Sequence, residues 1–215
     1  MKDIRRIGLL LIATFMMLPA MAQVSFGVRT GGAYSSLIQK VNDKYQAKSR
    51  FGFSVAGMAD IPLSKDKKWS LRPELGFVHQ GGSFYVNPKA QGMTTRADAW
   101  YYSIQVPVNV AYTFNFTDVS LSIFAGPVFD WSLFGKIKTG ENAERDIKFG
   151  VSEGKDLKPC TFGMDLGIAV DYYNFFFSVN SLCGMVDRQA KKLKGETSVF
   201  QNNVTFSLGY FFRSK

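Results

Sequence analysis

The chain has 215 residues, with 26 Lys and Arg against 17 Asp and Glu, and its formal net charge is +9. This length suits one β domain, because barrels and sandwiches often form single units of about 200 residues. A single His gives no pair of ligands for a metal site, and no segment beyond the N-terminus reaches the 18 consecutive apolar residues of a membrane-spanning helix.

Residues 1–22 are predicted to be a cleaved secretory signal peptide. Three basic residues among the first six precede an apolar run at residues 7–19, and residues 20–22 (AMA) supply the small-x-small pattern of a cleavage site. The apolar run is too short for a membrane-spanning helix, which needs about 20 residues. The mature chain would be residues 23–215, a single domain.

The mature sequence alternates between apolar and polar residues with a period of two, which is the pattern of β-strands. The first two predicted strands alternate weakly, and the later ones alternate clearly. Glycines and other small residues are frequent on the less apolar face, which suits a narrow barrel. In chain order the alternation that marks the strands lies at residues 24–36, 50–61, 69–77, 100–114, 121–131, 162–172, 175–185 and 204–212, and several of the predicted strands extend a few residues beyond it.

The predicted strand at residues 100–114 shows the pattern most clearly. Its apolar face carries Trp100, Tyr102, Ile104, Val106, Val108, Val110, Tyr112 and Phe114. Strands of soluble proteins average about 5–6 residues, whereas membrane strands need about 9–11. Aromatic rings stand at both ends of the apolar face, where a strand would meet the two membrane–water interfaces. We therefore expect the apolar face to look outward into lipid.

The links between the predicted strands alternate in length. Those after the first, third, fifth and seventh strands span about 13, 18, 27 and 12 residues, and those after the second, fourth and sixth, at residues 62–67, 115–117 and 173–174, span about 6, 3 and 2. Long extracellular loops alternating with short periplasmic turns are typical of outer-membrane barrels. The sequence predicts an all-β, eight-stranded, antiparallel up-and-down transmembrane β-barrel in the outer membrane of a Gram-negative bacterium, with both termini in the periplasm.

The two cysteines, Cys160 and Cys183, fall on two predicted strands that form one hairpin around residues 173–174. In that hairpin, residues that pair directly have numbers that add to 347, whereas the two cysteines add to 343. An offset of four residues is too large for a disulfide, whose Cα atoms lie within about 7 Å. We expect both cysteines to be free.

Polar residues on the inward faces are predicted to form a structural network in the lumen. An eight-stranded barrel is just wide enough for its own side chains, and buried charges must be paired. Glu74 or Asp165 would partner Arg29 or Arg72, and we expect no stable large conductance. The candidates are Arg29, Arg72, Glu74, Gln105, Asn109, Asp165, Asp171 and Asn180.

Short motifs resemble one family. Residues 71–77 (LRPELGF) with 80–82 (QGG) are similar to the third-strand motif of the PorT-like outer-membrane β-barrel domain of Bacteroidota, and residues 123–127 (IFAGP) resemble its fifth-strand motif. Residues 27–34 resemble its glycine-rich first strand. The resemblance implies an eight-stranded barrel with the architecture of OmpA and OmpX, and it supplies no catalytic residues to map. Some members of the family are linked to secretion machinery or gliding.

His79 is expected on the outward face as a polar residue at the membrane interface. The alternative is a lipid A-modifying hydrolase with His79 as the base and Ser83 as the nucleophile, and its support is that the two residues are near in sequence. Nucleophilic catalysis needs the base within hydrogen-bond reach of the hydroxyl and a third group that orients the base. We predict no catalytic site, no cofactor and no metal.

Basic residues are frequent in the predicted loops. Each run is interpreted as a solvated surface or as a contact with lipopolysaccharide phosphates. The preferred function is a non-enzymatic surface barrel that binds envelope components or a partner protein; the alternatives are a secretion accessory, the lipid A hydrolase and a soluble, lipocalin-like carrier. We expect no nucleic-acid binding. The loop residues in question are Lys40, Lys44, Lys48 and Arg50 in the first loop, Lys136, Lys138, Arg145, Lys148, Lys155 and Lys158 in the third, and Arg188, Lys191, Lys192 and Lys194 in the fourth.

Overall fold

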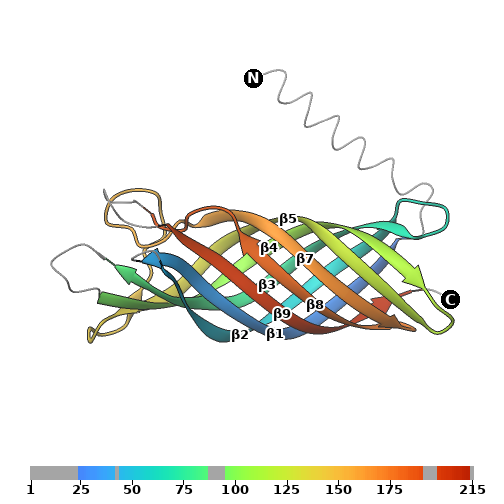
Figure 1. Cartoon of the computed structure of the whole chain (residues 1–215), viewed down its shortest axis with the longest axis horizontal. Helices are drawn as coiled ribbons and strands as arrows, with labels where there is room; N and C mark the ends of the chain where they lie inside the picture. Colours follow the sequence, from blue (N-terminus) through green and yellow to red (C-terminus); the bar gives the residue numbers. More distant parts are fainter. Residues whose placement is uncertain (1–23, 42–43, 87–94, 191–197, 214–215) are drawn as a thin grey trace, which may run out of the picture.

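Within the residues that the computed structural model describes, 24–41, 44–86, 95–190 and 198–213, eight antiparallel strands form a closed barrel (Figure 1). The predicted signal peptide lies outside these residues. Each strand of the ring pairs with the next, and β9 pairs back with β1, which confirms the predicted fold. The strands of the ring are β1 (Ser25–Val41), β2 (Lys44–Pro62), β3 (Trp69–Val86), β4 (Thr95–Asn115), β5 (Val119–Thr139), β7 (Cys160–Tyr172), β8 (Phe175–Gly184) and β9 (Val199–Phe212). The two-residue β6 (Arg145–Asp146) pairs with β5 outside the ring.

The barrel has two different ends. Its terminal end holds Val24 and Arg213 together with the short turns 63–68, 116–118 and 173–174, and its loop end holds the described residues 140–159 and 185–190 (Figure 1). The predicted turn at 173–174 is confirmed, and the other two turns lie within one residue of their predicted positions. None of the described helices is long and apolar enough to cross a membrane.

The predicted long link after the first strand is wrong. Strands β1 and β2 continue to Val41 and Lys44, so Lys40, Lys44, Lys48 and Arg50 belong to strands and not to a loop. The register of β2 against β3 shifts between Lys48 and Ser54, and Arg50 and Phe51 are exposed in succession. A bulge of this kind interrupts the period of two, which is why the alternation in the sequence ends before the strand does.

The hairpin of β7 and β8 has the predicted register. Tyr172 pairs with Phe175 and Met164 pairs with Cys183, and each pair of numbers adds to 347. Cys160 instead pairs with Trp131 of β5. Both cysteines are free, as expected.

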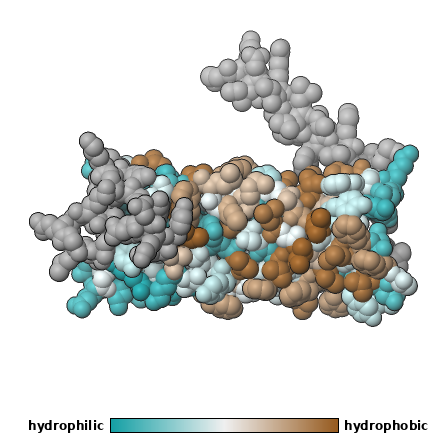
Figure 2. Space-filling view, viewed as in Figure 1, coloured by the Kyte–Doolittle hydropathy of each residue, from teal (hydrophilic) through white to brown (hydrophobic). Residues whose placement is uncertain are grey.

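The apolar faces of the strands point outward. On β4 every inward side chain from Tyr101 to Thr113 is buried, whereas Val110 and Phe114 on the other face are exposed. Leu75 on β3 is 62% exposed and Phe51 on β2 is 71% exposed. Figure 2 shows hydrophobic side chains gathered over the body of the barrel and hydrophilic ones toward its ends. A surface this apolar requires a hydrocarbon solvent, so the barrel lies in a membrane and is not a soluble carrier.

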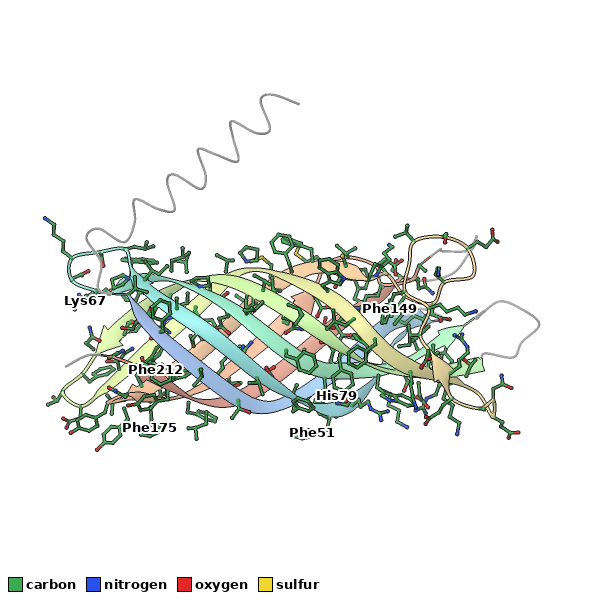
Figure 3. All side chains as sticks on the ribbon, turned by 180° about the vertical axis from the view of Figure 1, so that it is seen from behind. Phe51, Lys67, His79, Phe149, Phe175 and Phe212 are labelled. Atoms are coloured by element: carbon green, nitrogen blue, oxygen red, sulfur yellow. The ribbon has the colours of Figure 1, made fainter. Side chains whose placement is uncertain are left out.

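Aromatic rings gather toward each end of this apolar surface. At the terminal end, Trp69 lies 4.9 Å from Tyr112, and Phe175 lies 5.0 Å from Tyr210, measured between ring centroids. Toward the loop end, Tyr102 lies 4.8 Å from His79 and 4.9 Å from Phe134. Figure 3 shows Phe175 and Phe212 near the terminal end and Phe51 and His79 farther toward the loop end. Such rings favour the membrane–water interface.

Replacing Leu75 by arginine should lower the free energy of unfolding by about 2–4 kcal/mol, the cost of an arginine near the middle of the lipid-facing band. The measurement is urea unfolding in lipid vesicles. The matched control is Val151→Arg, because Val151 is 73% exposed but lies in the segment between β5 and β7. Equal stability of the two variants would contradict a lipid-facing position for Leu75.

Candidate functional site

The predicted polar residues lie inside the barrel, where they fill the lumen in three successive layers. Their side chains point inward because they occupy the alternate positions of strands whose other face is apolar. The buried inward residues among the candidates are Arg29, Arg72, Glu74, Gln105, Asn109, Asp165, Asp171 and Asn180.

The middle layer contains one ion pair and one carboxylate bound by amides. Arg29 Nε donates to Glu74 Oε2 at 2.8 Å, and the same guanidinium donates to Ser207 Oγ at 2.9 Å. Asp165 accepts hydrogen bonds from Asn109 and Asn180, each at 2.8 Å. The cavities beside Glu74 measure about 10 Å³ each, which is room for one water molecule.

The layer at the terminal end is centred on Arg72. Its Nε donates to Asp60 Oδ1 at 3.0 Å and its Nη2 donates to Ser122 Oγ at 3.1 Å. Arg72 is therefore paired with Asp60, which the sequence analysis did not propose as its partner. Asp171 is buried, its Oδ1 has no hydrogen-bond partner among the described residues, and it lines an open cavity of about 370 Å³ at the mouth of the barrel. Below Arg72, an apolar cluster of Met58, Phe176 and Phe211 fills the lumen.

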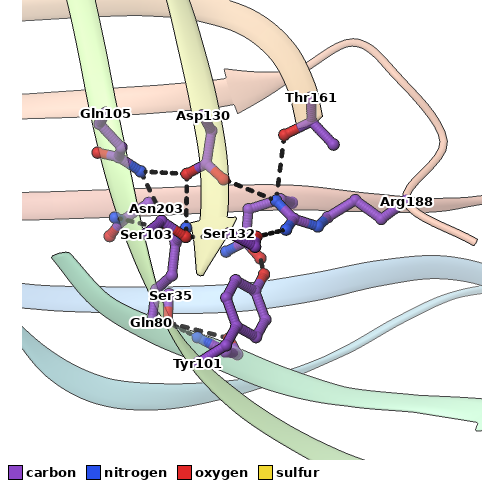
Figure 4. Close-up of polar contacts among 12 residues, drawn as sticks. Ser35, Gln80, Tyr101, Ser103, Gln105, Asp130, Ser132, Thr161, Arg188 and Asn203 are labelled. Atoms are coloured by element: carbon purple, nitrogen blue, oxygen red, sulfur yellow. Dashed lines mark hydrogen bonds and ion pairs between the residues drawn. The ribbon is translucent and has the colours of Figure 1, made fainter. Parts of the chain in front are cut away.

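The layer at the loop end is centred on Asp130 (Figure 4). Its Oδ2 accepts hydrogen bonds from Gln80 at 2.6 Å and from Gln105 at 2.8 Å. Its Oδ1 accepts one from Arg188 Nη1 at 3.2 Å. Of these residues, sequence reasoning identified Gln105. Asp130 stands between the outward Phe129 and Trp131, so the same alternation could have identified it.

Arg188 enters the lumen from the segment between β8 and β9. Its side chain is 0% exposed, lies 4.7 Å from the centroid of the Tyr101 ring, and donates to Ser132 and Thr161 in addition to Asp130 (Figure 4). The prediction that Arg188 belongs to a solvated loop surface is wrong. No alternation marks a residue outside the strands, so the sequence carries no signal for its burial.

The described residues 140–159 and 185–190 together form a plug at the loop end. Leu157 and Ile147 pack into the buried cluster that contains Leu37 and Tyr101. The two segments are also joined through the backbone, because the Lys158 amide donates to the Arg188 carbonyl at 2.8 Å. The plug and the polar layers close the lumen along the part of the chain that the structure describes.

The Arg145–Asp156 pair holds the plug on its outer side. Arg145 donates to both carboxylate oxygens of Asp156, at 2.7 and 2.6 Å, and the Lys148 amide donates to Asp156 at 2.8 Å. Partial burial by itself would raise the pKa of Asp156, but the hydrogen bonds from Arg145 and Lys148 outweigh it and hold the pKa below its ordinary value.

The plug should therefore stay ordered from neutral pH down to about pH 4, the ordinary pKa of an aspartate, and loosen only below it. The pKa of Asp156 is lower in the folded protein than in the unfolded chain. The ionised carboxylate therefore stabilises the plug fully above the unfolded pKa, and this stabilisation is lost as the pH falls through the lower folded pKa. Hydrogen exchange of the Ile147 and Leu157 amides would measure this. Loss of protection already at pH 6 would contradict the assignment.

The structure does not bring His79 and Ser83 together. Four residues separate them on β3, which is about 13 Å of strand. His79 packs against Phe53 and Tyr102, whereas Ser83 donates to Asp98 and accepts from Arg96 Nη2 at 3.1 Å. Among the described residues, no group of three or more His, Cys, Asp or Glu side chains could hold a metal ion.

Comparison with known proteins identifies the family to which this barrel belongs. Residues 19–187 match the family described as outer membrane protein beta-barrel domain. The structure is similar to that of Ail, the attachment invasion locus protein of Yersinia pestis, in complex with the heparin analogue sucrose octasulfate, at 15% identity and a TM-score of 0.48, covering 88% of this chain and 99% of that one.

Two further solved structures are similar. Neisserial surface protein A has 14% identity and a TM-score of 0.45, covering 87% of this chain and 97% of that one. OprG of Pseudomonas aeruginosa has 11% identity and a TM-score of 0.41, covering 90% and 98%. No curated protein matches the chain significantly. Because residues 19–187 are more than half of the 215, the chain belongs to the outer membrane protein beta-barrel domain family.

Proposed function

We propose that this chain is an integral outer-membrane protein without enzymatic activity, and that it acts through its outer wall and its loop end. The loop end would face the cell exterior and the termini the periplasm, which is the arrangement in which short turns are periplasmic. The observation that carries the proposal is the closed lumen. Arg29, Glu74 and Asp165 fill its middle, and Arg188 and Leu157 fill its loop end. A barrel with a filled lumen has no internal space for a ligand, so partners would bind to its outer wall and its loop end.

Purified protein in planar lipid bilayers should show no stable large conductance. The physical reason is that ions would need to displace three polar layers whose groups are already hydrogen-bonded to each other. Single-channel recording measures this directly, and a known porin in the same bilayers supplies the positive control. A reproducible porin-like current would contradict the proposal.

A role as an accessory of a secretion machinery is a second candidate. It is supported by the resemblance to PorT-like barrels, whose first-, third- and fifth-strand motifs fall on β1, β3 and β5. Co-purification after cross-linking in intact cells would test it: recovery of secretion components supports this candidate, and recovery of lipid alone opposes it. The hydrolase alternative gains no support from the separation of His79 and Ser83, and we expect lipid A mass spectra to stay unchanged on overexpression.

A further inference from the structure

The outer wall carries five cations on one side of the loop end. They are Lys48 and Arg50 of β2, Arg96 of β4, and Lys136 and Lys138 of β5, and we name this surface the basic face. Lys48, Arg50, Lys136 and Lys138 are exposed, and the side chain of Arg96 is 38% exposed. Lysine and arginine side chains so far apart in sequence share a surface because β2, β3, β4 and β5 pair in succession.

The pairing of the strands places these residues on one surface. Lys48 pairs with Ser83, Ser83 with Asp98, and Asp98 with Lys138, so one cross-strand row runs through β2, β3, β4 and β5. Cross-strand partners in a regular sheet point to the same side. Lys48 also pairs with the buried Leu37 of β1, and its place on the outer wall follows from its exposure next to the bulge in β2. In the next row Trp100 pairs with Lys136.

Arg50 joins the same surface from the bulge in β2. The centre of its guanidinium lies 4.5 Å from the centroid of the Trp100 ring, so the side chain reaches across β3. The residue of β3 that pairs with Trp100 is Gly81, where an added Cβ would collide with the backbone of Ala99 and Trp100. Stacking on the ring fixes the guanidinium and leaves its edge free to donate hydrogen bonds.

The basic face keeps a positive charge. The nearby carboxylates are Asp98, which accepts from Arg96 at 2.7 Å and from Ser83, Glu144, which lies 3.9 Å from Lys136, and Asp146, which pairs with Lys136 across β5 and β6. Five cations against these three carboxylates leave a formal charge of +2. Among the side chains that the structure describes, the loop-end exteriors of β1, β7, β8 and β9 carry no charged residue.

The basic face lies directly beyond the aromatic rings of the membrane interface. Along the outer face of β4, the order from the terminal end is apolar residues up to Ile104, then Tyr102 and Trp100, then Asp98 and Arg96. On β5 the order is Phe129, Trp131, Phe134, Lys136 and Lys138. This succession matches an amphiphile whose acyl chains lie in the bilayer and whose anionic groups lie just above its surface.

We infer that the basic face binds the phosphates of lipopolysaccharide, with the lipid A acyl chains lying against the apolar wall below. This inference rests on the proposed function, because the loop end must lie in the outer leaflet. Lipid A is the occupant because its phosphates stand at the surface in the leaflet that the loop end would face, directly over its own acyl chains. Arginine and lysine donate charge-assisted hydrogen bonds to phosphate oxygens, and Arg50 does so from a fixed plane.

The test compares lipid binding by the full-length protein in phosphatidylcholine vesicles. Bis-phosphorylated lipid A should bind at least about tenfold more tightly than dephosphorylated lipid A and than phosphatidylglycerol, and added salt should weaken it. The face variant Lys48→Gln, Arg50→Gln, Lys136→Gln and Lys138→Gln should lose at least about tenfold in affinity. The matched control, Lys65→Gln, Lys68→Gln, Lys148→Gln and Lys155→Gln, removes the same charge from a turn and a loop and should bind like the wild type.

Equal binding by the face variant and the wild type would overturn the inference, as would equal binding of phosphorylated and dephosphorylated lipid A or of phosphatidylglycerol. Loss of binding in the control variant alone would mean that the turn and loop lysines, and not the basic face, bind the phosphates, and it would also overturn the inference. Circular dichroism and electrophoretic mobility before and after heating would verify that each variant is folded. A wild-type barrel that inserts and conducts no ions but shows no lipid A preference would contradict this inference and leave the proposed function standing.

Discussion

Replacing Arg188 by alanine should lower the free energy of unfolding by about 3–5 kcal/mol, the usual cost of removing one partner from a buried ion pair. The Asp130 carboxylate would remain in the lumen with Gln80 and Gln105 as donors but without a compensating cation. The same change removes the contact that holds the segment between β8 and β9 over Tyr101. Urea unfolding in lipid vesicles measures the first effect, and proteolysis of the plug in the folded barrel measures the second.

The matched control for this change is Arg145→Ala. Arg145 also forms an ion pair with an aspartate, but its side chain is 48% exposed, and exposed pairs contribute about 0–1 kcal/mol. If the two variants lose the same stability, the assignment of Arg188 as the anchor of the plug is wrong. If Arg188→Ala unfolds as readily as expected but the plug keeps its resistance to protease, Leu157 and not Arg188 holds the plug.

Replacing Glu74 by alanine should also lower the free energy of unfolding by about 3–5 kcal/mol, because it leaves the Arg29 guanidinium buried with Ser207 as its hydrogen-bond acceptor. The double variant Arg29→Leu with Glu74→Leu should recover most of that loss, since it removes both charges and fills the space with apolar side chains. Glu141→Ala in the exposed segment after β5 is the control and should be neutral.

The double variant distinguishes two roles of the pair. Recovery of stability with unchanged bilayer conductance would mean that the pair is structural and that packing closes the lumen. A double variant that folds but conducts ions would show that the ion pair is the barrier, which would contradict our view of the lumen as a continuous packed interior.

The alternation of residue types determined much of this fold from the sequence alone. Leu75 and Val110 face outward, and Glu74 and Asn109 face inward, because the period of a strand is two and depends on the local chain. The β7–β8 register followed from the two-residue turn at residues 173–174, and it placed Cys160 and Cys183 too far apart to bond. These features need no information about distant segments.

The tertiary structure decided everything that depends on contacts between distant segments. Arg188 is buried because two loop segments fold back into the lumen, and no periodic pattern extends into loops. Arg72 is paired with Asp60 and not with Asp165 because the register of β2 and β3 places Asp60 beside it at the terminal end. Lys48 and Lys138 share the basic face because β2 and β5 are joined through two intervening strands. Alternation fixes which side of a strand a residue occupies, whereas its partners follow from closure and register, which are properties of the whole barrel.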